Sequence, residues 1–368
     1  MRVGIDVTPL CMRSGGIPRY VEKLVAGLAE IDCPERFALC GPADPAQLAN
    51  LAPGVGRDRS GFPLERYAKQ IYPIGAGKLD LFHATNYLPP LLLRVPTVLT
   101  VHDLTVQLFP STHGAVRRLR HRLLPSMCHR AVRIIADSHS TKHDLVRLFG
   151  LPEEKIDVVH LAAGEEFHPI NDPDELERVR WRYGLPRHFV LYLGDLNPRK
   201  GLEVLLNAHA RLRRHGCPYP LVLAGEGDPQ YVESLTRTAS EFGLELGEGL
   251  LMPGHVRESD LPALYSTCEL FVYPSAYEGF GLPPLEAMAC GAPVLVPDNS
   301  AFFELYKGSP MLFKLDSTES LVEAMDRALT SCEWRGTLVD SGLKQAERRT
   351  WSTVAQETLD CYRRALHA

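Results

Sequence analysis

Two glutamates separated by seven residues stand out in the segment 273–291, which reads YPSAYEGFGLPPLEAMACG. Glu278 lies among glycines and prolines, which predict a loop, and Glu286 opens the run EAMACG, which predicts the start of a helix. Because a carboxylate accepts hydrogen bonds from hydroxyl groups, one glutamate suits a hexose and the other a ribose. Glu286 alone also suits a simple interaction with the helix dipole, whereas nothing in the loop requires Glu278 for folding.

A pair of cations follows a predicted strand in the segment 194–212, GDLNPRKGLEVLLNAHARL. We expect Arg199 and Lys200 in the first turn of a helix that begins near Gly201. The N-terminus of a helix offers unpaired N–H groups and a positive dipole, which suit a phosphate. The pair would then bind a diphosphate and stabilise it as a leaving group. The alternative is a solvated basic pair in front of a helix.

Short apolar runs alternate with amphipathic stretches along the chain, which is typical of an α/β fold with parallel strands covered by helices. A first series of strands is predicted at 2–7, 79–84, 97–102, 133–138 and 156–161, and a second at 188–194, 220–225, 249–254, 270–275 and 293–297. Helices are predicted at 15–30, 202–214, 231–243, 320–331 and 351–368. The two series indicate two similar domains joined near 164–186. The loop with Glu278 would lie at the carboxyl end of its strand, where open α/β sheets bind ligands.

Five segments together carry a resemblance to a known family. EGFGLPPLE resembles the E-x7-E motif of the retaining glycosyltransferases of family 4, and NPRKG resembles their diphosphate site. MRVGIDVTPL with SGGIPRYV resembles their first strand and glycine loop, VHDL their histidine site, and LMPGHV the loop beside the nucleotide base. The order and spacing match the family over nearly the whole chain. The resemblance implies the α/β GT-B fold, with two Rossmann-like domains facing each other across a cleft.

The resemblance also implies roles for individual residues. Arg199 and Lys200 would neutralise the departing diphosphate, Glu278 would contact the donor sugar, and Glu286 would hold the ribose. His102 would lie close to the transferred sugar, although His83 stays open as an alternative for that histidine. Gly16 would approach the phosphate or the acceptor. The backbone N–H groups of Gly279, Phe280, Gly281 and Leu282 would lie near the sugar and phosphate. His255 and Val256 would lie beside the base.

The function implied by the resemblance is retaining, metal-independent transfer of a hexosyl group without a cofactor. Residues 1–168 would bind the acceptor and residues 169–350 the nucleotide-diphosphate sugar. The helix 351–368 would cross back to the first domain, and packing on its own domain stays open as the alternative. GGIPRY and YEGFGLPPLEAMACGAPVLV resemble bacterial mannosyltransferases, so we expect GDP-mannose as donor and a saccharide or lipid-linked saccharide of polysaccharide synthesis as acceptor. Two alternatives stay open: a nucleotide-sugar epimerase on the same fold, and a non-catalytic subunit that binds a nucleotide sugar.

The sequence Asp172–Pro173–Asp174 has the form D-x-D, which binds a metal in another glycosyltransferase fold. Its context favours a helix start instead, with a polar cap, a proline in the first turn and acids near the positive end of the dipole. It also lies in the joining segment and does not follow a nucleotide-binding strand. We therefore expect no metal site.

The stretch 104–136 contains no acidic residue. Its arginines are interleaved with apolar residues, which indicates a basic amphipathic helix on the acceptor-binding domain. Such a helix suits an anionic lipid surface or a lipid-linked diphosphate, and a merely solvated basic helix is the open alternative. The arginines are 117, 118, 120, 122, 130 and 133, and the apolar residues are Leu119, Leu123, Leu124 and Met127.

Composition sets further limits. With 40 basic and 45 acidic residues the net charge is −5, so nothing global indicates a nucleic acid as partner. The nine cysteines include no C-x-x-C pair, which favours reduced, mostly buried thiols. No signal peptide is recognised and no apolar run is long enough to span a bilayer, so we expect a cytoplasmic protein, peripheral at the inner membrane face if the basic helix makes contact.

Overall fold

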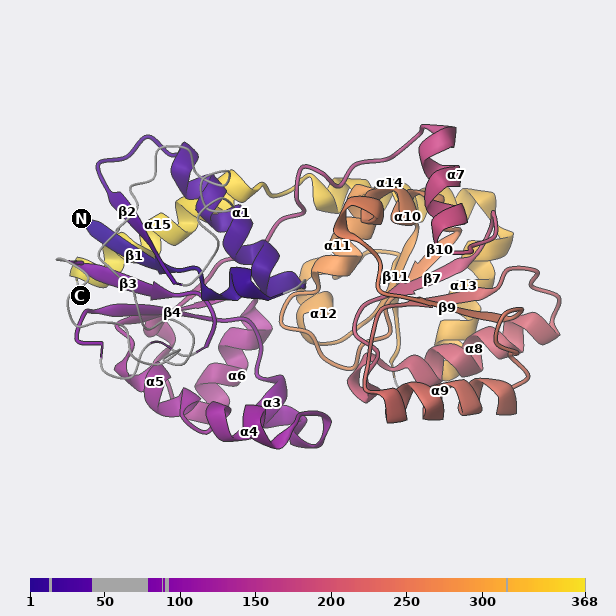
Figure 1. The fold of residues 1–368 in the computed structure, drawn as a ribbon, viewed down its shortest axis with the longest axis horizontal. Helices are drawn as coiled ribbons and strands as arrows, with labels where there is room; N and C mark the ends of the chain where they lie inside the picture. Colours follow the sequence, from indigo (N-terminus) through magenta and orange to yellow (C-terminus); the bar gives the residue numbers. More distant parts are fainter. Residues whose placement is uncertain (13–14, 42–78, 88, 90–92, 316, 368) are drawn as a thin grey trace. The chain divides into compact units, whose positions relative to one another are not determined.

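The chain folds into two compact units, and each is described by itself (Figure 1). The computed structural model describes residues 1–12, 15–41, 79–87, 89, 93–315 and 317–367. The first unit comprises Met1–Leu161 together with Arg349–Ala368, and the second comprises Ala162–Arg348. The division of acceptor and donor binding between the two domains stays a prediction.

A parallel sheet forms the centre of the first unit, and the order of its described strands is β2-β1-β3-β4-β5-β6. Residues such as Leu81, Val98 and Ile134 are fully buried, as expected where helices cover both faces. The strands are β1 (Arg2–Asp6), β2 (Arg36–Cys40), β3 (Leu81–Ala84), β4 (Thr97–Val101), β5 (Arg133–Ala136) and β6 (Ile156–Val158).

Helices cover both faces of this first sheet. In Figure 1, α1 and α15 lie on one side of it and α5 and α6 on the other. The C-terminal helix α15 thus belongs to the first unit, where it packs against α1. The helices are α1 (Gly16–Glu30), α3 (Thr105–Leu108), α4 (Ala115–His121), α5 (Leu124–Arg130), α6 (His139–Phe149) and α15 (Trp351–His367).

The second unit contains another parallel sheet, and the order of its described strands is β12-β11-β10-β7-β8-β9. Counted along the chain within this unit and read from the β9 edge, the order is 3-2-1-4-5-6, that of a dinucleotide-binding fold. The strands are β7 (Val190–Leu193), β8 (Leu221–Ala224), β9 (Leu250–Gly254), β10 (Leu270–Val272), β11 (Val294–Pro297) and β12 (Leu312–Phe313).

The helices of the second unit also form two layers. In Figure 1, α8, α9 and α13 lie on one side of the sheet, and α7, α10, α11 and α14 on the other. The helices are α7 (Pro173–Arg182), α8 (Leu202–Arg214), α9 (Pro229–Glu241), α10 (Leu261–Thr267), α11 (Leu282–Ala289), α12 (Ser300–Tyr306), α13 (Thr318–Thr330) and α14 (Cys332–Ala346).

The predicted α/β class is confirmed. Every predicted strand overlaps an observed one, and the five predicted helices overlap α1, α8, α9, α13 and α15. Strands β2 and β12, one at an edge of each described sheet, were not predicted. All nine cysteines are free thiols, and five of them are buried.

Candidate active site

The strand order of the second unit reverses between β7 and β10, which are hydrogen-bonded neighbours. Chain connections leave these two strands in opposite directions, so the loops 194–201 and 273–281 meet at the carboxyl edge of the sheet. This is the position at which open α/β sheets form a binding crevice. The two loops carry Arg199, Lys200 and Glu278.

The structure brings these three predicted residues into direct contact. Oε1 of Glu278 accepts a hydrogen bond from Nζ of Lys200 at 2.6 Å and from Nη1 of Arg199 at 2.9 Å. The side chains are largely buried, with exposed fractions of 7% for Lys200, 10% for Arg199 and 13% for Glu278. The site therefore combines two fixed cations and one carboxylate in a small, poorly solvated volume.

Burial and charge act against each other in this cluster. Burial alone would raise the pKa of Glu278, but the positive charges of Lys200 and Arg199 outweigh it and the pKa is lowered. The pKa of Lys200 is lowered because its burial and the nearby Arg199 outweigh the attraction of Glu278. Cations held in this way can stabilise an anion such as a departing diphosphate.

The approach of the two loops depends on glycine. Gly201 has a φ of 66°, and a Cβ at this position would lie 2.2 Å from the carbonyl oxygen of Pro274. Gly281 has a φ of 95°, and its Cβ would lie 2.3 Å from the ring of Phe302. A larger residue at 201 would push the two loops apart, and one at 281 would have to displace the ring of Phe302.

Several residues that support this cluster were not predicted. Ser275 donates a hydrogen bond to Oε1 of Glu278 at 2.5 Å, and the hydroxyl of Tyr273 accepts one from Lys200 at 2.6 Å. Both lie in the segment 273–291, in which the sequence analysis named the two glutamates and residues 279–282 but neither of these two.

A third loop, after β11, holds the loop of Glu278 in place. The hydroxyl of Ser300 accepts the backbone N–H of Glu278 at 3.1 Å, and the amide of Asn299 donates to the carbonyl of Ala276 at 2.8 Å. Ser300 adopts a φ of 41°, an uncommon conformation that is often found at functional sites. Their position after the strand next to β10 is the signal that could have identified them.

The expected placement of the cations in a helix was wrong. Arg199 and Lys200 lie in a single 3-10 turn, Pro198–Lys200, and α8 begins only at Leu202. Gly201, in a left-handed conformation, separates this turn from the helix.

The expected placement of Glu286 at a helix start was also wrong. Helix α11 begins at Leu282, so Glu286 lies beyond its first turn, 1% exposed, and accepts a hydrogen bond from Tyr265 at 3.3 Å. The simple dipole explanation for this carboxylate therefore does not apply.

The remaining expected donor contacts lie at the same edge of the sheet. Gly279 and Phe280 are buried in the loop after β10, and Gly281 and Leu282 lead into α11. His255 is exposed and Val256 is buried directly after β9, two strands from β7. Their contacts with sugar, phosphate and base stay predictions.

His102 lies in the first unit, directly after β4, beside Asp137, which directly follows the neighbouring strand β5. Its Nδ1 lies 2.7 Å from Oδ2 of Asp137, and its Nε2 donates to the carbonyl of Thr85 at 3.0 Å. Burial would lower the pKa of His102, but Asp137 and the Thr85 carbonyl outweigh it and the pKa is raised. Asp137 was not predicted.

The first unit also contains His83 and Gly16, two further residues that the sequence analysis names as candidates for the site. His83 is fully buried and bonds to the hydroxyls of Tyr362 and Thr100 at 2.7 Å each, and burial lowers its pKa to about 3. It is a neutral core histidine, and which of the two histidines lies near the transferred sugar stays a prediction. Gly16 is exposed and is the first residue of α1.

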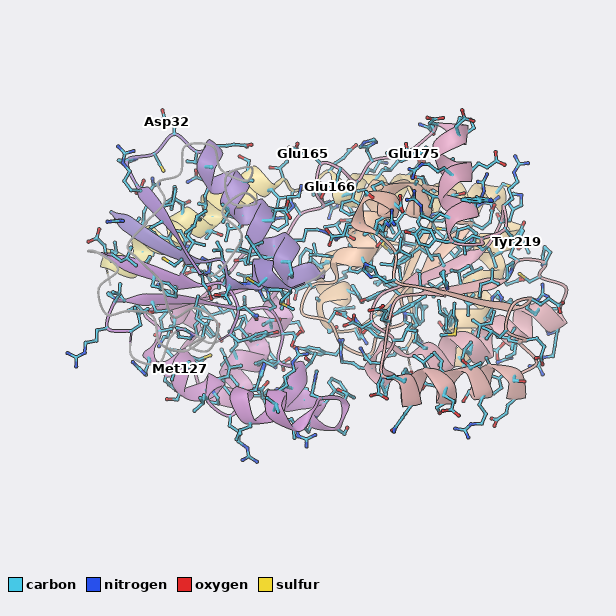
Figure 2. All side chains as sticks on the ribbon, in the orientation of Figure 1. Asp32, Met127, Glu165, Glu166, Glu175 and Tyr219 are labelled. Carbon is cyan, nitrogen blue, oxygen red and sulfur yellow. The ribbon has the colours of Figure 1, made fainter. Side chains whose placement is uncertain are left out.

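The D-x-D sequence forms the expected helix start. Asp172 caps α7 by accepting the backbone N–H of Asp174 at 3.1 Å, and Pro173 is the first residue of the helix. Glu175, labelled in Figure 2, lies in the first turn of the same helix. Within the described ranges, no group of three or more acidic, histidine or cysteine side chains is arranged to hold a metal ion.

The basic stretch 104–136 forms three short helices, α3, α4 and α5, and not one. Leu124 and Met127 (Figure 2) are buried in the core, and Arg133 lies in β5 and pairs with Asp157 at 2.6 Å. Three apolar residues remain outside: Val116, Leu119 and Leu123, with exposed fractions of 75%, 62% and 40%. None of the helices in the described part of the chain has the length and apolar character of a membrane span.

Comparison with known families gives two matches. Residues 175–344 match the model of the glycosyl transferases group 1, and residues 14–163 match the model of glycosyltransferase family 4. Together the two models cover the central parts of both units.

Two mannosyltransferases of Escherichia coli are similar in sequence. The O-antigen chain mannosyltransferase B is 32% identical over 306 residues, which are 80% of this chain and 77% of that protein. The serotype-specific mannosyltransferase WbdA is 32% identical over 241 residues, which are 65% of this chain but only 29% of WbdA. The chain thus spans less than a third of the length of WbdA.

A solved structure shares the fold. The structure of Anabaena HepE, determined in complex with UDP and glucose, has a TM-score of 0.74 and 20% sequence identity, and the match covers 98% of this chain and 99% of that one. The predicted fold class, GT-B with two Rossmann-like domains, is confirmed by this match.

Proposed function

The chain belongs to the glycosyltransferase family that these models describe, and on this premise we propose that it transfers a hexosyl group from a nucleotide-diphosphate sugar to a saccharide or lipid-linked acceptor, with retention of configuration. The observation that carries the proposal is the contact of Arg199, Lys200 and Glu278 at the strand-order reversal of the second unit. Two cations beside a carboxylate suit a donor that combines a diphosphate with sugar hydroxyls.

The proposed chemistry follows from these residues. Arg199 and Lys200 neutralise the negative charge that develops on the diphosphate as the glycosidic bond breaks. Glu278 accepts hydrogen bonds from the sugar hydroxyls and fixes the sugar, and Glu286 holds the ribose. The departing phosphate takes the proton of the acceptor hydroxyl on the same face of the sugar. Positioning and electrostatics supply the catalysis, without a metal ion or cofactor.

GDP-mannose is the proposed donor, and surface polysaccharide synthesis is the proposed setting. Two of the similar proteins are named as mannosyltransferases, one of them for the O-antigen chain. HepE was crystallised with UDP, so the base of the donor is the point that needs a test. A lipid-linked acceptor also suits peripheral contact of α4 with a membrane.

Calorimetry with UDP, GDP, ADP and TDP, each with and without EDTA, tests the proposal. We expect micromolar binding of GDP that EDTA does not change. Arg199→Ala and Lys200→Ala should each lower the turnover of GDP-mannose by about 10²–10³-fold, as the loss of a donor to a developing anion does. Absence of binding by every nucleotide would contradict the proposal. Conversion of the donor without an acceptor would indicate the epimerase. Binding of the donor without any turnover would indicate the non-catalytic subunit.

A further inference from the structure

The cluster at the carboxyl edge of the second sheet already contains an anion of its own. Oε1 of Glu278 accepts hydrogen bonds from Lys200, Arg199 and Ser275, at 2.6, 2.9 and 2.5 Å. Lys200 and Arg199 are the cations that the proposed function assigns to the diphosphate. Carboxylate and phosphate oxygens both accept hydrogen bonds and both carry negative charge, so they compete for these donors.

We propose that Glu278 is also the internal counter-anion of Arg199 and Lys200, which returns to them after transfer and displaces the product nucleoside diphosphate. The inference rests on the proposed function, because it requires a donor and a product that carry a diphosphate. It gives Glu278 a second role, in product release, beside its contact with the sugar.

Arg199 and Lys200 need a nearby anion because they are buried. Lys200 is 6% exposed as a residue, and its ammonium group contacts the hydroxyl of the buried Tyr273 at 2.6 Å. A buried cation without a nearby anion is strongly disfavoured. When the diphosphate leaves, Glu278 replaces it, and the free site keeps a paired charge.

The local structure allows the exchange to be confined to one side chain. The loop of Glu278 is tied to α12 through its backbone N–H on Ser300 and through the amide of Asn299 on Ala276. Ser275 donates to the same carboxylate oxygen as the two cations. Rotation of the Glu278 side chain therefore suffices to move its negative charge between the cations and a bound sugar.

The exchange of Glu278 between the cations and the sugar affects the binding of the donor and of the product differently. With the intact donor bound, Glu278 loses its cations but gains hydrogen bonds from the sugar hydroxyls. With the product bound, the sugar is gone and Glu278 gains nothing in return. The carboxylate therefore weakens the binding of the product more than that of the donor, and product release limits the turnover of many enzymes.

The motif offers a matched pair of variants for the test. Glu278→Gln keeps the size of the side chain but removes its charge, and Glu286→Gln makes the same change in the buried carboxylate of α11. Calorimetry would measure the binding of GDP, UDP and inorganic pyrophosphate to wild type and both variants. We expect Glu278→Gln to bind the nucleoside diphosphate and pyrophosphate at least about tenfold more tightly. Glu286→Gln should leave pyrophosphate binding unchanged and should not tighten nucleotide binding.

Ser275→Ala provides a second test that keeps all three charges. It removes one donor that holds Oε1 against the cations, so we expect a gain in pyrophosphate affinity that is smaller than in Glu278→Gln. This variant can be measured in place of Glu278→Gln if Glu278→Gln fails to fold. Unchanged or weaker pyrophosphate affinity in the folded variants, with normal binding by wild type, would overturn the inference. If wild type and variants bind no nucleotide at all, the proposed function fails instead.

Discussion

At the scale of single residues, the charge of His102 is set by its neighbours. A carbonyl oxygen only accepts, so the contact with Thr85 requires a proton on Nε2, and the contact of Nδ1 with the carboxylate of Asp137 favours a second proton there. The rings of Tyr20 and Tyr87 enclose the imidazole edge-on, with centroid distances of 4.8 and 6.0 Å. The arrangement suits an imidazolium paired with Asp137.

This pair predicts a pH dependence of stability. The pKa of His102 is raised in the folded protein, so the folded state holds this proton more tightly than the unfolded chain. The stabilisation is fully present below the ordinary pKa of histidine, about 6.5, and is lost as pH rises through the folded pKa. Chemical unfolding of wild type across this range should show the loss.

Asp137→Asn provides the comparison for this prediction. Without the carboxylate, burial dominates and the pKa of His102 falls, so the loss of stability above pH 6.5 should disappear. Burial lowers the pKa of His209 to about 4 and that of His83 to about 3, so their contribution has the opposite sign, rising as pH approaches 6.5, and it is common to wild type and Asp137→Asn. An unchanged pH profile in Asp137→Asn would show that His102 is neutral in the folded protein.

The charged residues of the candidate site could be predicted from the sequence, but the residues that hydrogen-bond to them could not. Two cations and a glutamate in loops after strands indicated a ligand site, and the structure joins Arg199, Lys200 and Glu278. Ser275 and Asp137 were missed because a serine or aspartate after a strand has many ordinary roles, such as capping a helix. Which role applies depends on contacts with distant segments, as the spacing of 35 residues between His102 and Asp137 illustrates.

At the scale of elements, the contact of α1 with α15 depends on a small residue. A Cβ added at Gly27 of α1 would lie 3.0 Å from the Cβ of Ala355 and 3.0 Å from the carbonyl oxygen of Trp351. Gly27→Leu should therefore separate the helices and destabilise the protein by about 1–3 kcal/mol. Gly336→Leu in α14 is the matched control, since nothing lies within 4 Å of a Cβ there. Equal melting temperatures of the two variants would contradict the predicted close packing.

Whether a strand could be predicted from the sequence depended on its burial and its length. Central strands such as β4 are apolar on both faces and were predicted from their composition. Strand β2, RFALC, begins with an exposed arginine, and β12 has only two residues, so neither gives a clear apolar run. The start of α11 was misplaced because the left-handed Gly281 that precedes it also suits an open loop.

At the scale of the whole molecule, charge is unevenly distributed along the chain. The net charge is −5, yet the stretch 104–136 has no acidic residue. Within it, the exposed Val116 and Leu119 lie on α4 beside Arg117 and Arg118. Apolar side chains surrounded by arginines suit the surface of a membrane that contains anionic lipids.

Sedimentation with lipid vesicles tests this surface. Wild type should bind vesicles with anionic lipids at low salt and should be released at high salt, because salt screens the attraction of the arginines. Leu119→Gln should weaken this binding about tenfold by removing an apolar side chain that inserts between headgroups. Leu246→Gln is the matched control, because Leu246 is 58% exposed but stands between Glu245 and Glu248. Equal binding to neutral and anionic vesicles, or equal losses in the two variants, would show that α4 is an ordinary solvated helix.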